Sequence, residues 1–171
     1  MLTKTWRQVI MAEVEVIVES LWELDEDQLE AQIGSRVQAI GDDVAGRRGA
    51  RGIDPASLES IDVNVAARAS IDPRFLDAGR QLVDRVNPLA YELMCKPLGG
   101  NDAQTQKILD EASGQNYTKA ASMLAPALIS GLGLAPAIAT LLATLIIKKI
   151  ANYTATGICE TWQQNLPKPA S

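Results

Sequence analysis

Apolar residues recur every three or four positions along most of the chain. Between residues 4 and 24 they form one broad face, and between 26 and 45 they form a narrower, more regular stripe: Leu29, Ile33, Val37, Ile40 and Val44. This spacing is typical of helices that bury one side. We therefore expect an N-terminal amphipathic helical hairpin, with antiparallel helices over about 4–24 and 26–45.

Local signals mark the turn of this hairpin. Asp25 is followed three positions later by Gln28, which is the capping-box pattern at the start of a helix. Leu24 and Leu29 occupy the two positions of a hydrophobic staple. Gly34 lies inside the second helix and costs about 1 kcal/mol relative to alanine, so we expect tertiary packing to hold the helix there.

Later helices are predicted from a capping residue followed by proline, at Asp54-Pro55, Asp72-Pro73 and Asn87-Pro88. Proline suits the first turn of a helix because its missing N–H would have no partner there. The pattern predicts separate helices over 73–86 and 88–95. Residues 61–65 alternate apolar and polar side chains as a strand would, but no partner strand is evident, so a helix or an extended connection is favoured.

The next helix is expected to begin after Asp102 and to end at Ser113, with Gly114 in the left-handed conformation that closes many helices. Asn116 is expected to cap the helix that follows. That helix leads into the most apolar part of the chain.

Residues 120–147 contain no ionisable side chain. Gly131, Gly133 and Pro136 predict a turn that divides this apolar run into two pieces, each shorter than the roughly 20 apolar residues needed to span a bilayer. We expect a central apolar helical hairpin with arms at about 116–132 and 136–165. Its candidate core or membrane-facing residues are Leu128, Leu132, Leu141, Leu142, Leu145 and Ile146.

The predicted fold class is all-α, a multi-helix bundle with the apolar hairpin at its centre. We expect the N-terminal helical hairpin over 1–46, a basic Gly/Arg loop over 47–53, the helical bundle over 54–166 and a tail over 167–171. With an apolar fraction of 47% and a charged fraction of 22%, the composition is that of an ordinary globular protein.

Charge is unevenly distributed along the chain. The formal net charge is −5, and eight acidic residues with no basic one lie between Glu13 and Glu30. A basic loop follows, with Arg47, Arg48 and Arg51 as candidate contact residues. A solvated acidic face is the simple interpretation, and association of that face with the basic loop of a neighbouring copy is the alternative. Nucleic acid is disfavoured as a partner because no aromatic residue lies between Trp22 and Phe75 to stack on bases.

The chain contains no histidine, which excludes His-based triads and His-containing zinc sites. Cys95 and Cys159 are interpreted as buried thiols of a reducing compartment, which favours a cytoplasmic location. The adjacent carboxylates Asp25 to Asp27 are interpreted as complementing a helix N-terminus. We therefore expect no catalytic residue, no metal, no cofactor and no small-molecule ligand, although a histidine-free enzyme is kept as a minor alternative.

The favoured function is a non-enzymatic cytoplasmic interaction or assembly module that binds itself or another protein through apolar helix faces. The interface candidates are Trp6, Ile10, Ile17, Leu21, Ile158 and Trp162. The alternative is a membrane-inserting or peripherally membrane-associated effector that uses residues 120–150. In layout, an apolar helical hairpin surrounded by amphipathic helices resembles the soluble form of pore-forming toxins and of membrane-inserting cell-death regulators. This resemblance covers the last third of the chain and involves no shared motif.

Overall fold

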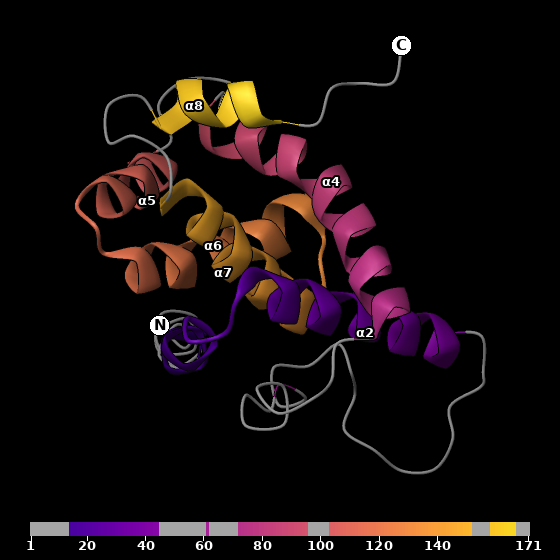
Figure 1. Ribbon diagram of the computed structural model, residues 1–171. Helices are drawn as coiled ribbons and strands as arrows, with labels where there is room; N and C mark the ends of the chain where they lie inside the picture. The colour runs from indigo at the N-terminus through magenta and orange to yellow at the C-terminus, as the bar shows by residue number, and fades with distance from the viewer. Residues whose placement is uncertain (1–13, 45–60, 62–71, 96–102, 152–157, 167–171) are drawn as a thin grey trace.

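A computed structural model describes residues 14–44, 61, 72–95, 103–151 and 158–166 (Figure 1). Within these residues the chain is helical, with no strand, and the predicted all-α multi-helix bundle is confirmed. Residues 14–21 are helical, and the further helices are α2 (Glu26–Val44), α4 (Pro73–Cys95), α5 (Ala103–Ser113), α6 (Tyr117–Leu132), α7 (Pro136–Ala151) and α8 (Ile158–Asn165). The predicted basic loop 47–53, the tail 167–171 and the helix start at Pro55 lie outside this description.

The start of α2 follows the sequence prediction closely. The Asp25 N–H donates to the Gln28 side-chain oxygen at 2.9 Å, and the Gln28 N–H donates to the Asp25 carboxylate at 2.8 Å. This reciprocal pair is the expected capping box. Leu24 and Leu29 are both buried, as expected of a hydrophobic staple. The arrangement of the first two helices differs from an antiparallel hairpin, because the described helical residues 14–21 are seen nearly end-on in Figure 1 while α2 runs across the view.

Two glycines explain how α2 crosses α4. A Cβ atom at Gly34 would collide with the Phe75 carbonyl oxygen, and one at Gly79 would collide with the Glu30 carbonyl oxygen. The two backbones are therefore in direct contact, which only glycine permits. Figure 1 shows α2 crossing the N-terminal half of α4, and this is the most extensive helix-helix contact in the described structure. Packing compensates for the helix-weakening glycine, as expected for Gly34.

Helices α6 and α7 form the predicted apolar hairpin. Gly133 caps α6 in the left-handed conformation with φ 69°, and its N–H donates to the Ile129 carbonyl. The first arm ends at residue 132 and the second begins at 136, as predicted, so residues 133–135 form the turn and Gly131 still lies within α6. Pro126 also lies within α6 without ending it.

Most of the hairpin is enclosed by the chain itself, whereas residues 129–136 around its turn are exposed or half-buried. Helix α7 packs against α6, α2 and α5, and all its residues from Ala137 to Ile147 are buried. Among the predicted core residues, Leu128, Leu141, Leu142 and Leu145 are 0% exposed, Ile146 is 1% exposed, and Leu132 is half-buried. The Thr140 and Thr144 hydroxyls each donate at 2.8 Å to the carbonyl four residues earlier, which satisfies these polar groups inside the apolar core.

The prediction of separate helices over 73–86 and 88–95 is wrong. Helix α4 continues from Pro73 to Cys95 with Pro88 inside it. Val86 and Ala90, on either side of the proline, are both buried, so the same core supports both halves of the helix. Asn87 does not serve as a cap, because its side chain bonds to a residue of α8.

The turn between α5 and α6 differs from expectation in two details. The residue with positive φ is Gln115, at 67°, and not Gly114. Its N–H donates to the Ala112 carbonyl and the next N–H donates to the Glu111 carbonyl, which is the Schellman pattern of helix termination. Asn116 makes no capping bond to α6 and instead donates from its amide to the Glu111 carboxylate at 2.8 Å.

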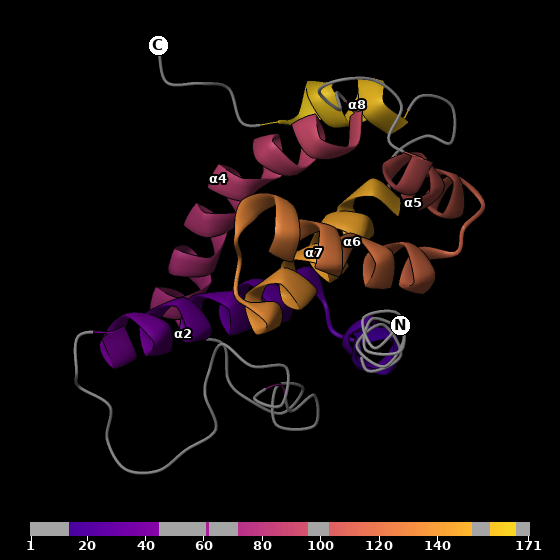
Figure 2. The ribbon, with the colours of Figure 1, turned by 180° about the vertical axis from the view of Figure 1, so that it is seen from behind.

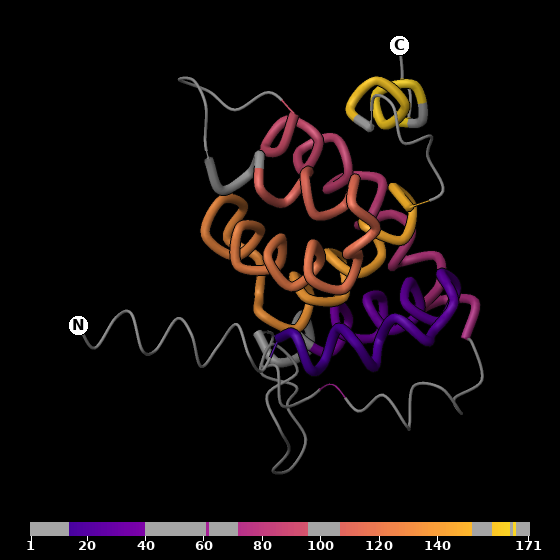
Figure 3. Tube along the Cα trace, turned by 90° about the vertical axis from the view of Figure 1, so that its left-hand side faces the viewer, coloured from indigo at the N-terminus to yellow at the C-terminus, as the bar shows by residue number. Residues whose placement is uncertain are grey.

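The predicted long helix over 136–165 is described as two helices, α7 and α8. Figures 1 and 2 show α8 lying at the end of α4 that is remote from α2, outside the central pair α6 and α7. Figure 3 shows the same separation from the side. Of the ambiguous segment 61–65, only Ile61 is described; it is neither helical nor extended in a strand, and it packs half-buried against the core.

Candidate functional site

The structure places the predicted interface residues in different environments. Leu21 is 0% exposed and Trp162 is 1% exposed, and both belong to the chain's own core. In this conformation they offer no surface to a partner. Ile17 is half-buried. The remaining candidates lie outside the part of the chain whose side chains are described: Trp6, Ile10, Ile158, Arg47, Arg48 and Arg51.

The acidic segment identified in the sequence divides into two parts. Its second part, at the start of α2, is neutralised by cations of other helices. Arg80 on α4 donates from Nε to the Glu30 carboxylate at 2.9 Å and from an Nη to the Asp27 carboxylate at 3.1 Å. Lys149 at the end of α7 lies 3.6 Å from the Glu26 carboxylate. These ion pairs join α2 to both α4 and α7.

Burial dominates the titration of Glu30. Desolvation raises the pKa of this carboxyl above its ordinary value, although Lys149 and the hydrogen bond from Arg80 act in the opposite direction. The hydrogen bond to Glu30 in turn raises the pKa of Arg80. Burial therefore disfavours the charged form of Glu30, even though the mostly exposed guanidinium of Arg80 lies beside it.

An aromatic pair and a lysine attach α7 and α6 to the N-terminal part of the structure. The rings of Trp22 and Tyr117 are stacked with centroids 5.6 Å apart, and the Lys148 ammonium lies 4.9 Å from the Trp22 ring centroid. Stacked rings and a cation over an indole are both stabilising arrangements. In this conformation the Lys148 and Lys149 ammonium groups contact the protein's own side chains at the C-terminal end of the apolar run.

The first part of the acidic segment faces solvent. Glu15, Glu19 and Glu23 are exposed, and Val16 between them is 65% exposed. Glu15 and Glu19 are one helical turn apart and Val16 is adjacent, so the described helix presents two carboxylates along one side of an exposed apolar side chain. We call these four residues the acidic patch. The only other large apolar side chain exposed among the described residues is Leu89, at 44%.

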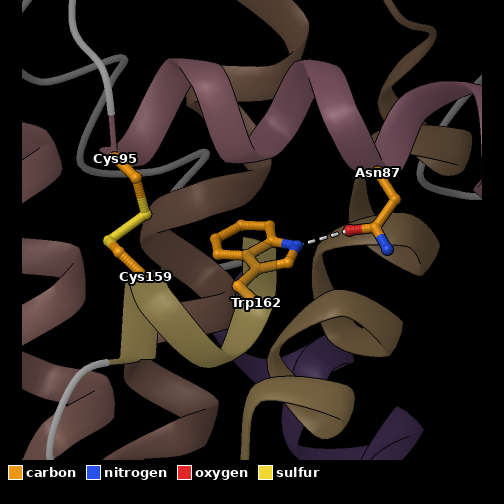
Figure 4. Close-up of a disulfide and its surroundings, with 4 residues drawn as sticks. All are labelled: Asn87, Cys95, Cys159 and Trp162. Atoms are coloured by element: carbon orange, nitrogen blue, oxygen red, sulfur yellow. Dashed lines mark hydrogen bonds between the residues drawn. A yellow bond between two sulfur atoms is a disulfide. The ribbon is translucent and has the colours of Figure 1, made fainter. Parts of the chain in front are cut away.

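A disulfide attaches α8 to α4 (Figure 4). The Sγ atoms of Cys95 and Cys159 are bonded at 2.07 Å, and the two residues are separated by 64 positions in sequence. The interpretation of these residues as free thiols is wrong, and the argument from them for a reducing compartment no longer holds. Sequence spacing could not reveal the pair, because the separate course of α8 brings Cys159 to the end of α4.

A hydrogen bond between α8 and α4 lies next to the disulfide. Trp162 Nε1 donates to the Asn87 side-chain oxygen at 2.7 Å, and the Trp162 ring meets Tyr91 edge-on with centroids 5.7 Å apart. Asn87, Tyr91 and Cys95 recur every four residues and therefore form one stripe along α4. We call the disulfide together with the Trp162 to Asn87 hydrogen bond the α8 clasp. In the sequence, the even number of cysteines is the only indication of this clasp.

The described residues contain no group of three acidic, cysteine or histidine side chains arranged to hold a metal ion. Among the described helices, none combines the length and the apolarity required to cross a membrane. The described structure therefore presents an exposed acidic patch, a largely enclosed apolar hairpin and a short helix held by the α8 clasp.

The chain matches no protein-family model, no curated protein and no solved structure.

Proposed function

We propose that this chain is a non-enzymatic helical interaction module that self-associates or binds a basic partner protein through the acidic patch. The observation that carries the proposal is the exposure of Val16, at 65%, among the exposed carboxylates of Glu15, Glu19 and Glu23. An exposed apolar side chain flanked by carboxylates suits a partner surface that combines an apolar contact with basic side chains.

The enclosed apolar hairpin supports this proposal. Because Leu141, Leu142 and Leu145 contact other helices of the same chain, the molecule has a core that does not depend on lipid or on a second copy. A self-sufficient core leaves the outer helix surfaces to determine what the protein contacts. The sequence itself contains a suitable basic complement in Arg47, Arg48 and Arg51, so a second copy is the first partner to test.

The proposal includes the cytoplasmic location expected from the sequence. The disulfide bears on this location. Disulfides of cytosolic proteins are usually transient, whereas those of secreted proteins persist. The oxidation state of Cys95 and Cys159 in cells that make this protein distinguishes the two situations.

Light scattering after size-exclusion chromatography tests self-association. We expect the mass of the full chain to rise with protein concentration at low salt and to fall towards the monomer at high salt, because exposed charges are screened. Val16→Lys should prevent this rise in mass. Leu89→Lys, which introduces lysine at an exposed apolar position on α4 instead, should leave the rise intact. A monomer at every concentration and salt level would contradict self-association.

Flotation with vesicles of neutral and anionic phospholipid tests the membrane alternative. The proposed module should remain with the soluble fraction at neutral and acidic pH. Flotation with the vesicles would instead favour opening of the apolar hairpin and would displace the interaction module as the leading function.

A further inference from the structure

Helix α8 is held to the molecule by few contacts. It packs chiefly against α4, and Trp162 is the single fully buried side chain among those described in it. Its remaining described side chains are exposed or half-buried. An eight-residue helix is too short to be stable on its own in water, so its conformation depends on these attachments.

The attachments are concentrated in the α8 clasp. Figure 4 shows the Trp162 indole between the disulfide and Asn87, so the covalent bond and the hydrogen bond lie on opposite sides of one ring. Cys159 and Trp162 are three residues apart and therefore share the face of α8 that meets α4. Breaking the disulfide would leave the buried Trp162 ring, its hydrogen bond and partly buried contacts such as that of Leu166 to hold the helix.

The disulfide is not enclosed in the core. Both Cys95 and Cys159 are only partly buried, and each lies at an end of its helix. A disulfide in contact with solvent can be attacked by a thiolate, whereas an enclosed one is protected. The rest of the core does not depend on it, since α2, α6 and α7 pack together away from α8.

From this arrangement we infer that the α8 clasp is a redox switch: a dithiol reductant opens the disulfide and releases α8 from the Asn87–Tyr91–Cys95 stripe of α4. One thiolate of the reductant attacks a sulfur of the disulfide, forming a mixed disulfide and expelling the other cysteine as a thiolate. The second thiol of the reductant then displaces the remaining cysteine. Two electrons and two protons pass to Cys95 and Cys159, and the reductant becomes a disulfide. The inference is independent of whether the chain self-associates.

Hydrogen exchange of the full chain, measured by mass spectrometry with and without dithiothreitol, tests the switch. On reduction, we expect amide exchange within residues 158–166 to accelerate at least tenfold, while exchange in α6 and α7 changes less than twofold. Acrylamide quenching of Trp162, assigned by comparison with Trp162→Phe, should increase under the same conditions.

The double variant Cys95→Ser, Cys159→Ser provides the matched control. It should show rapid exchange in α8 whether or not the reductant is present. Unchanged protection of α8 after mass spectrometry has shown two free thiols would overturn the inference. So would equal acceleration throughout α6, α7 and α8, because the disulfide would then stabilise the whole fold.

Discussion

At the scale of single residues, the clearest strain lies at Gln115. This residue closes α5 in the left-handed conformation, φ 67°, where a side chain clashes with the backbone and glycine does not. The Schellman hydrogen bonds that require this conformation are present around it. The backbone conformation thus conflicts with the residue type at this position.

Gln115→Gly should raise the free energy of unfolding by about 1 kcal/mol, because glycine removes the left-handed penalty while the hydrogen bonds remain. Chemical denaturation measures the change. Gln115→Ala is the control and should have little effect, since alanine retains the clash. A glycine variant no more stable than the alanine variant would contradict the assigned conformation.

Glu30 gives a prediction with a definite pH dependence. Its pKa is raised in the folded protein, chiefly by desolvation, so the folded state holds the proton more tightly than the unfolded state does. This group therefore contributes most to stability below its unfolded pKa and loses that contribution as pH rises through the folded value.

Glu30→Gln keeps an oxygen to accept from Arg80 but never becomes charged. The variant should match the wild type in stability at acidic pH, where Glu30 is protonated, and exceed it at neutral pH. Thermal unfolding across this pH range measures the difference. Lower stability of the variant at neutral pH would show that the ion pair with Arg80 outweighs desolvation.

At the scale of the elements, the crossing of α2 over α4 depends on Gly34 and Gly79. Both lie in helices, where a change from glycine to alanine normally stabilises by up to about 1 kcal/mol. Here the new methyl group would collide with the backbone of the opposing helix, so the sign reverses.

Gly34→Ala and Gly79→Ala should each destabilise the fold by roughly 3 kcal/mol, the upper part of the range for overpacked interfaces. Gly131→Ala is the matched control, because its Cβ would meet only the end of the Leu93 side chain, at 3.3 Å. That variant should be neutral or stabilised. Urea denaturation of the three variants separates the effects, and stable variants at Gly34 and Gly79 would contradict the crossing.

Local sequence signals predicted the elements better than their boundaries. The capping box at Asp25 and the glycine that ends α6 depend on a few adjacent residues, and both were found. The prediction of a separate helix starting at Pro88 was wrong because buried residues on either side of the proline keep α4 continuous. The division between α7 and α8 was missed because the apolar pattern continues past it, through Ile158 and Trp162.

The candidate site was predicted less well than the fold. Periodicity identifies the apolar face of a helix but does not say whether the same chain covers it, and Leu21 and Trp162 are covered. The disulfide joins residues whose distance is set by the tertiary fold alone. The acidic segment was visible in the sequence, yet its division into paired and solvent-facing parts required the positions of Arg80 and Lys149.

At the scale of the whole molecule, the structure assigns the apolar run to the protein's own core. Leu141→Ala and Leu145→Ala should each cost about 2–5 kcal/mol, because both side chains are fully enclosed. Leu89→Ala, at a side chain 44% exposed, should cost much less. Equal effects of the buried and exposed substitutions, measured by denaturation, would contradict this assignment.

The enclosure of the apolar hairpin's core, residues 120–125 and 137–147, is most directly tested by hydrogen exchange of the full chain in plain buffer, without lipid or detergent. The structure predicts that amides in the middle of α6 and α7 exchange more slowly than those at exposed positions of the other described helices. Rapid exchange in α6 and α7, with protection appearing only when detergent or lipid is added, would contradict the closed core.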